Sequence, residues 1–209
     1  TYPSEFTTEN WPVRNMKEQA DAIDAPGHKV IGAVNADFFD IGVTGWPDGA
    51  VIHNGEIIKE FCKEPSNTVY FGITKDGKVS MGGYTAFLGC KSNLYEAVCG
   101  RTELIKNGKA LENGDASLAP RTAIGANEDG TIVYIAVFDE RESNSPRNGI
   151  TYRAMAECLK RLGCYNAVNL DGGGSSTFLV RTGDDYEVWN KQPGATLRKV
   201  ADGLAIIQK

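Results

Sequence analysis

The chain has 209 residues, of which 41% are hydrophobic and 23% are charged, as in an ordinary globular protein with room for a sizeable core. Its net charge of −5 and the lack of a basic run argue against binding to nucleic acids or anionic membranes. No stretch reaches the roughly 20 apolar residues that a membrane-spanning helix needs.

The start of the chain, Thr1-Tyr2-Pro3, carries neither an initiator Met nor a signal-like segment. We interpret it as a trimmed or mature end, so a targeting peptide could have been lost. The five cysteines form no Cys-x-x-Cys pair, which argues against a zinc site. A Cys90–Cys99 disulfide is one interpretation of them, and small buried hydrophobic side chains are the favoured one.

The first predicted element is a helix in which Val13, Met16, Ala20 and Ile23 share one face, with Pro12 at its first position. Strands connected by tight turns follow. Four dipeptides with a glycine in second place lie between short apolar runs, where they predict β-hairpins: Asn54-Gly55, Asp76-Gly77, Asn107-Gly108 and Asp129-Gly130.

The last third of the chain predicts a strand, a helix and a second strand. The continuous apolar run 131–138 indicates a strand buried on both faces. A helix over 152–162 should begin after the N-cap Thr151 and end at Gly163. The run 167–170 predicts a shorter strand, so that the helix connects two strands of one sheet. The expected fold is α+β: one domain over residues 1–209, with a mixed β-sheet, several hairpins and a few packed helices.

Four stretches of the chain look unusual for plain structure. They are Asn35-Ala36-Asp37-Phe38-Phe39-Asp40, then 120–125 (PRTAIG), 139–141 (DER) and 169–177 (NLDGGGSST). In the last of these, three glycines directly after Asp171 free the backbone for close approach to a ligand, and their amides can form an anion-binding concavity. A plain Gly-Ser turn with a capping Asp is the competing interpretation. The run lacks the Lys of a P-loop and does not match the G-x-S-x-G nucleophile elbow.

The charged residues in these stretches each have a functional and a plain structural interpretation. Arg121 can bind a phosphate through its planar guanidinium group, although a lone Arg more often pairs with a carboxylate of its own protein. Converging strand-end carboxylates suit general acid–base chemistry or a divalent cation. Taken one at a time, each Asp is more often a turn former or a helix cap.

Together the motifs resemble the phosphodiester glycosidase family, over about residues 30–207. The resemblance rests on NADFF at 35–39, PRTAIG at 120–125, the strand-end Asp139, the helix at 155–163 and NLDGGGSST at 169–177. Bacterial relatives in this family are often labelled exopolysaccharide-biosynthesis proteins. The resemblance therefore implies a secreted bacterial protein, extracellular or in the cell envelope, whose signal peptide is not in this chain. The resemblance implies Asp171, Asp37 and Asp139 as candidate catalytic carboxylates. It implies a substrate-binding set made of Asn35, Arg121, Thr122, Gly172, Gly173, Gly174, Ser175, Ser176 and Arg198.

The implied reaction is hydrolysis of the sugar C1–O bond in a sugar-1-phosphodiester, such as an N-acetylglucosamine-1-phospho-linked glycan or a cell-surface polysaccharide. Such a glycosidase requires no cofactor, although a divalent cation bridging Asp residues to phosphate is an alternative. Three competing functions stay open: a non-catalytic carbohydrate-binding module, a metal-dependent phosphodiesterase that cuts P–O, and a structural surface or tail protein. Neither a nucleic-acid partner nor a membrane span is expected.

Overall fold

The computed structural model describes residues 10–61, 67–112, 114–139, 149–191 and 196–208. Two β-sheets pack face to face, and every strand pair of these described residues is antiparallel. The predicted α+β class is therefore right in its elements, but the protein is mostly β, and the expectation of a mixed sheet is wrong. That residues 1–209 form one domain stays a prediction.

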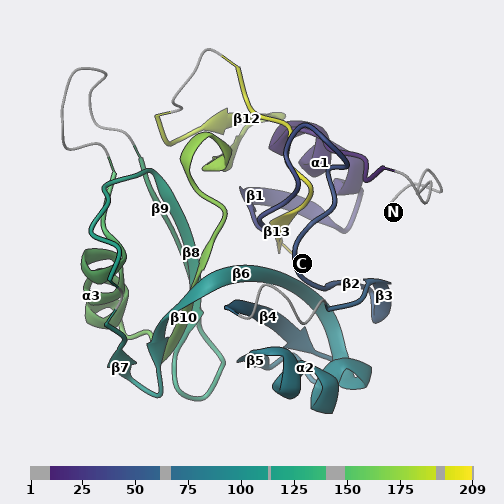
Figure 1. Ribbon diagram of the computed structural model, residues 1–209. Coiled ribbons are helices and arrows are strands. Elements are labelled where there is room, and N and C mark those ends of the chain that lie inside the picture. The colour runs from purple at the N-terminus through teal and green to yellow at the C-terminus, as the bar shows by residue number, and fades with distance from the viewer. Residues whose placement is uncertain (1–9, 62–66, 113, 140–148, 192–195, 209) are drawn as a thin grey trace.

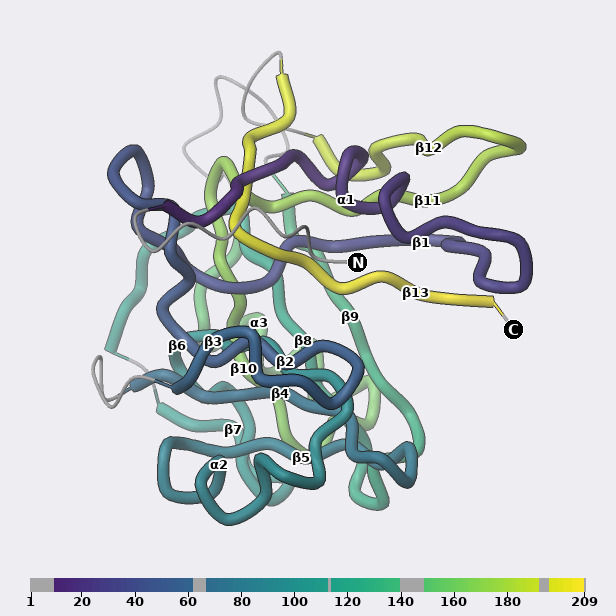
Figure 2. The backbone as a smooth tube through the Cα atoms, turned by 90° about the vertical axis from the view of Figure 1, so that its right-hand side faces the viewer, coloured from purple at the N-terminus to yellow at the C-terminus, as the bar shows by residue number. Residues whose placement is uncertain are grey.

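The smaller sheet has the strand order β12-β11-β1-β13. Figure 2 shows it as one layer above the strands of the larger sheet. Helix α1 covers its outer face, where Met16 and Ala20 pack against Ala33 and Leu179. The bounds are Met16–Ile23 for α1, Lys29–Asn35 for β1, Phe178–Thr182 for β11, Asp185–Val188 for β12 and Gly203–Gln208 for β13.

The larger sheet has the order β3-β2-β6-β10-β8-β9, with the β4–β5 hairpin and β7 also paired around β6. Its strands are β2 (Val51–His53), β3 (Glu56–Lys59), β4 (Thr68–Thr74), β5 (Val79–Gly82), β6 (Leu94–Lys106), β7 (Lys109–Ala110), β8 (Arg121–Ala126), β9 (Val133–Phe138) and β10 (Asn166–Leu170). The helical elements beside it are α2 (Tyr84–Cys90), the 3-10 turn η1 (Lys91–Asn93) and α3 (Tyr152–Leu162), and η2 (Gly173–Ser175) follows β10.

The core between the two sheets is aliphatic and aromatic. Phe71, Val98, Ile124 and Leu170 of the larger sheet pack with Leu204 of the smaller one. The opposite face of the larger sheet is covered by α3 at one end and by α2 at the other (Figure 1). The ends of β1 and β10 thus meet at the edge of the inter-sheet core.

Helix α3 and the four hairpins are confirmed. The Thr151 hydroxyl accepts a hydrogen bond from the Ala154 amide at 3.2 Å, and Gly163 ends the helix with a left-handed φ of 105°. Each predicted dipeptide joins an antiparallel pair, namely β2–β3, β4–β5, β6–β7 and β8–β9. Both central residues have positive φ in the turns at Asn54 and Asn107, as a type I′ turn requires.

Two local predictions are wrong, and one suggested bond is absent. Helix α1 starts at Met16 because Asn15 and Glu18 form a capping box, so Pro12 lies outside it. Strand β9 is only partly buried because it is an edge strand of the larger sheet. Cys90 and Cys99 are free thiols, so they form no disulfide; Cys62 lies outside the described residues.

Candidate functional site

Two predicted motifs meet where β1 and β10 end. The Asp171 amide donates to the Ala36 carbonyl at 2.8 Å, and the Asn35 side chain donates to the Asp171 carbonyl at 2.7 Å. The Asn35 side-chain oxygen accepts from the Thr122 hydroxyl at 2.9 Å and from the Thr177 amide at 3.1 Å. Asn35 and Thr122 therefore join three of the four predicted stretches, and their polar side-chain atoms are engaged with the protein itself.

The Asp171 carboxylate has one fixed oxygen and one unpartnered oxygen. Its Oδ1 accepts from the Gly172 amide at 2.8 Å, whereas the buried Oδ2 has no hydrogen-bond partner among the described residues. Burial raises the pKa of Asp171. The Ser175 side chain, the Gly172 amide and the charge of Arg198 lower it. An oriented carboxylate that leaves one oxygen for another molecule suits nucleophilic or general-base chemistry.

Two of the three glycines after Asp171 have a backbone reason to be glycine. At Gly172 a Cβ would crowd the Pro120 carbonyl, and Gly173 has a φ of 57°. At Gly174 a Cβ would meet only the guanidinium group of the exposed Arg198 side chain, which can move away. The run forms the 3-10 turn η2, in which the Gly172, Gly173 and Ser175 amides donate to acceptors of the protein itself. The predicted anion-binding concavity therefore has competing internal partners at these amides, and it stays a prediction.

Asp37 and Asp202 form a buried carboxylate pair. The Asp37 amide donates to Asp202 Oδ1 at 2.8 Å, and the Cys99 amide donates to Asp37 Oδ1 at 2.5 Å. Strand β6 pairs with β2 at Ala97 and with β10 from Arg101 onwards. The Asp37 carboxylate binds the backbone of β6 between these two pairings. Burial raises the pKa of Asp37 well above its usual range and that of Asp202 to about 7.

The buried pair predicts that stability falls as pH rises. Because the pKa of Asp202 is 3.8 in its reference state and about 7 when folded, the folded protein holds a proton that the unfolded chain releases in this window. The surrounding charges are Asp37, Asp171 and Lys59. Asp202→Asn keeps an acceptor for the Asp37 amide, and we expect it to raise the melting temperature at pH 8 more than at pH 5. Equal shifts at both pH values would contradict this.

Arg121 is held by its own protein. Its Nε donates to the Ile150 carbonyl at 2.9 Å, one Nη lies 3.2 Å from both the carbonyl and the hydroxyl of Ser117, and the guanidinium group stacks on Tyr152 at 3.7 Å. Asp115 lies 3.5 Å from the same nitrogen. The prediction that Arg121 binds a substrate phosphate stays untested, and these contacts compete with it.

For Arg121→Lys we expect a loss of stability with little kinetic effect. A lysine cannot reproduce the bonds to Ile150 and Ser117 together with the stacking on Tyr152, so unfolding should become easier by roughly 1–3 kcal/mol. Denaturant unfolding and kcat/KM would be measured on the same preparation. A tenfold lower kcat/KM at unchanged stability would instead support phosphate binding by Arg121.

The remaining predicted residues lie around η2. Ser175 and Ser176 are fully buried, and the exposed Arg198 lies 3.4 Å from the Ser175 hydroxyl. Asp139 is partly exposed, and its Oδ2 accepts from the Lys191 amide at 2.8 Å. Glu140 and Arg141 of the same stretch lie outside the described residues.

The structure adds residues that the motifs did not identify. Arg101 pairs with Asp48 at 2.5 Å and lies over the Phe38 ring at 5.1 Å from its centroid. Asp48 raises the pKa of Asp171, so these charges act on the candidate site. Asp48 and Asp202 stand in Asp-Gly pairs that look like ordinary turns, and Arg101 stands alone within a strand, so their spacing gave no signal.

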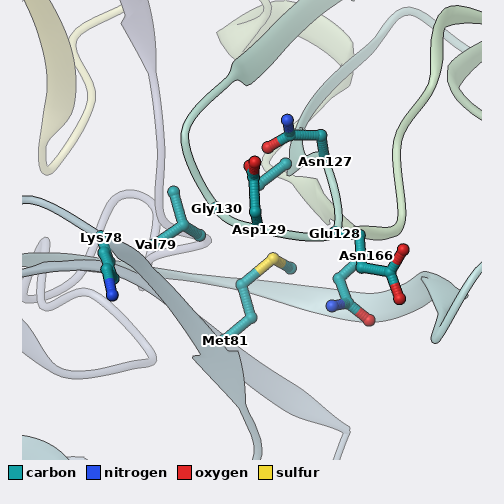
Figure 3. A pocket seen from close by; sticks show the side chains of 9 residues that line it. Lys78, Val79, Met81, Asn127, Glu128, Asp129, Gly130 and Asn166 are labelled. Carbon is teal, nitrogen blue, oxygen red and sulfur yellow. The ribbon is translucent and has the colours of Figure 1, made fainter.

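A shallow hollow of about 110 Å³ lies away from this site, between β5 and the turn at 127–130 (Figure 3). Asn166 lines it, at the end of β10 opposite to Asp171, and it contains none of the predicted site residues. In the part of the chain that the structure describes, no three His, Cys, Asp or Glu side chains are grouped as a metal site. None of the described helices combines the length and apolar character that crossing a membrane requires.

Comparison with known proteins identifies the family to which this sequence is similar. The sequence model of the phosphodiester glycosidase family matches residues 28–207, which include every predicted site residue. The chain belongs to the phosphodiester glycosidase family. It is 27% identical over 168 residues to the mouse N-acetylglucosamine-1-phosphodiester alpha-N-acetylglucosaminidase, covering 71% of this chain and 31% of the mouse protein. To the human enzyme of the same name it is 31% identical over 130 residues, or 53% of this chain and 24% of that protein.

The fold is also that of a solved family member. The catalytic domain of the zebrafish N-acetylglucosamine-1-phosphodiester alpha-N-acetylglucosaminidase, auto-inhibited by its pro-peptide, superposes with a TM-score of 0.73 at 22% identity. The match covers 95% of this chain and 68% of that one. The chain spans less than a third of the length of the mouse and human relatives.

Proposed function

We propose that this member of the phosphodiester glycosidase family hydrolyses the C1–O bond of a sugar-1-phosphodiester, giving a free sugar and a phosphomonoester. The carrying observation is Asp171, whose Oδ1 accepts the Gly172 amide and whose Oδ2 has no hydrogen-bond partner in the part of the chain that the structure describes, with the charge of Arg198 nearby. The family relatives, named for action on an N-acetylglucosamine-1-phosphodiester, support the same chemistry. An N-acetylglucosamine-1-phospho-linked glycan or cell-surface polymer is the proposed substrate class.

Asp171 and Arg198 have different chemical roles in this proposal. Asp171 Oδ2 attacks the anomeric carbon or activates water towards it. Arg198 neutralises the departing phosphate, because its guanidinium group lies over Gly174 with its side chain exposed to an incoming anion. A phosphate is already a good leaving group, so a strong general acid matters less than in the cleavage of an ordinary glycoside.

The Asp37–Asp202 pair has a supporting electrostatic role. Asp202 and Asp171 repel each other when both are charged. A proton kept on the buried pair near neutral pH removes part of that repulsion, so Asp171 stays ionised more readily. This makes Asp37 a positioning residue in the proposal: its amide fixes Asp202 and its carboxylate binds the Cys99 amide.

The test is product analysis with the methyl diester of N-acetylglucosamine-1-phosphate. The proposal expects free N-acetylglucosamine and methyl phosphate in equal amounts, formed about 10²-fold or more slowly by Asp171→Asn. Binding without cleavage would favour a carbohydrate-binding module. N-acetylglucosamine-1-phosphate with methanol would favour a phosphodiesterase. The extracellular or cell-envelope location and the role in exopolysaccharide metabolism stay predictions.

A further inference from the structure

One face of the larger sheet carries a row of three polar residues. Thr68 on β4 pairs with Arg101 on β6, and Arg101 pairs with Asn169 on β10. Directly paired residues of antiparallel strands project from the same face. Their neighbours Val69 and Val168 point into the core between the sheets, so the row lies on the opposite face.

Each member of this row has a buried polar atom without a partner. Asn169 is 1% exposed and Thr68 is 2% exposed. Within the described residues, no hydrogen bond reaches either side-chain atom of Asn169, the Thr68 hydroxyl or the Arg101 Nε. Burying polar groups in this way costs free energy and is rare in folded proteins. Three neighbouring residues of this kind lower the stability of the fold, and a polar ligand could supply the missing hydrogen bonds.

The row adjoins the carboxylate of the proposed reaction. Asn169 lies on β10 and Asp171 follows directly after the end of that strand, two residues further on. Arg101 also forms an ion pair with Asp48, and the charge of Asp48 raises the pKa of Asp171. A molecule held by the row therefore lies next to the proposed reacting group. The identity of that molecule, a sugar, rests on the proposed function.

We propose that Thr68, Arg101 and Asn169 form the subsite for two adjacent hydroxyl groups of the sugar ring. The Asn169 carboxamide offers an acceptor and donors side by side, and neighbouring hydroxyls can accept and donate in turn. A trans N-acetyl group presents its N–H and C=O on opposite sides, so it cannot engage both carboxamide atoms at once. In an N-acetylhexosamine ring, the adjacent pair is the hydroxyls on C3 and C4. The row spans two strand spacings, roughly 10 Å, which accommodates one sugar ring.

The test combines two nearly isosteric variants with deoxy sugars. Asn169→Leu and Thr68→Val remove the unpartnered groups, so we expect an unchanged or higher melting temperature. Binding of N-acetylglucosamine, measured by saturation-transfer NMR and titration, should weaken tenfold or more in each. The 3-deoxy and 4-deoxy analogues should bind the wild-type protein tenfold more weakly than the parent sugar. Asn166→Leu is the matched control on β10; it removes an acceptor from the Asn107 amide, so it should lower the melting temperature and leave binding unchanged.

The possible results separate this proposal from the reaction. Equal binding by the wild type and both variants, equal binding of the deoxy sugars, or no sugar binding at all would overturn the subsite. If Asn169→Leu does not fold, Thr68→Val and the deoxy series still decide. Sugar binding that depends on Asn169, without release of sugar from a sugar-1-phosphodiester, would keep the subsite and refute the proposed hydrolysis.

Discussion

Asp171→Asn should give a folded protein whose kcat/KM is lower by about 10²-fold or more, the scale of a lost acid–base or nucleophilic group. The asparagine carbonyl can still accept the Gly172 amide, which holds Oδ1 in the native protein. Removal of a buried charge also means that the melting temperature should be unchanged or higher. The measurement is kcat/KM for a sugar-1-phosphodiester, with a thermal melt of the same sample.

Asp129→Asn is the control for this substitution. Asp129 lies in the turn between β8 and β9, and its Oδ1 accepts from the Thr131 amide, a bond that asparagine can keep. Its kinetics should match the wild type within about twofold. A folded Asp171→Asn protein with near-normal turnover would remove Asp171 from the mechanism.

Gly49→Ala should lower stability by about 3 kcal/mol, at the upper end of the cost of overpacking a core. A Cβ at Gly49 would overlap the Cβ and Sγ atoms of Cys99 and crowd Asp37 Oδ2. Cys99 is 1% exposed and its side chain is too short to move away, so the strand or the Asp37 loop must shift. Activity should fall with stability, because Asp37 and its bond to Asp202 lie in that loop.

Gly89→Ala is the matched control for the backbone effect. Gly89 lies in α2, and a Cβ there meets nothing within 4 Å. Alanine is the better helix former by about 0.5–1 kcal/mol, so this variant should be slightly more stable than the wild type. Denaturant unfolding of both variants would decide. A Gly49→Ala protein as stable as the wild type would show that the Cys99 contact relaxes freely.

What could be predicted from the sequence was local. Asn54-Gly55 and Asn107-Gly108 specify their turns through positive φ at both positions, and Thr151 with Gly163 specifies the ends of α3. The start of α1 was wrong because the Asn15–Glu18 capping box outweighed the position of Pro12. The exposure of β9 was also wrong, because an apolar run does not reveal whether its strand ends up at a sheet edge.

The site residues that belong to sequence motifs could be predicted. Those that join the site only through the packing of distant strands could not. Asn35, Asp171 and Thr122 belong to recognisable runs, and the hydrogen bonds of Asn35 do bring those runs together. Asp202 becomes important only because β13 starts beside β1, which places it against Asp37. Asn169 did offer a signal, since it is a polar residue between the apolar Val168 and Leu170, but only the register of β4, β6 and β10 aligns it with Thr68 and Arg101.

The position of bond cleavage is the most direct measure of the central claim. Hydrolysis of the methyl diester of N-acetylglucosamine-1-phosphate in oxygen-18 water separates the two possible sites of attack, because water enters at either the anomeric carbon or phosphorus. An Asp171 carboxylate beside a phosphate-neutralising Arg198 suits an oxocarbenium-like centre at the carbon. The account predicts, by mass spectrometry, one heavy oxygen in the free sugar and none in methyl phosphate. Label in the phosphate product, with none in the sugar, would contradict it.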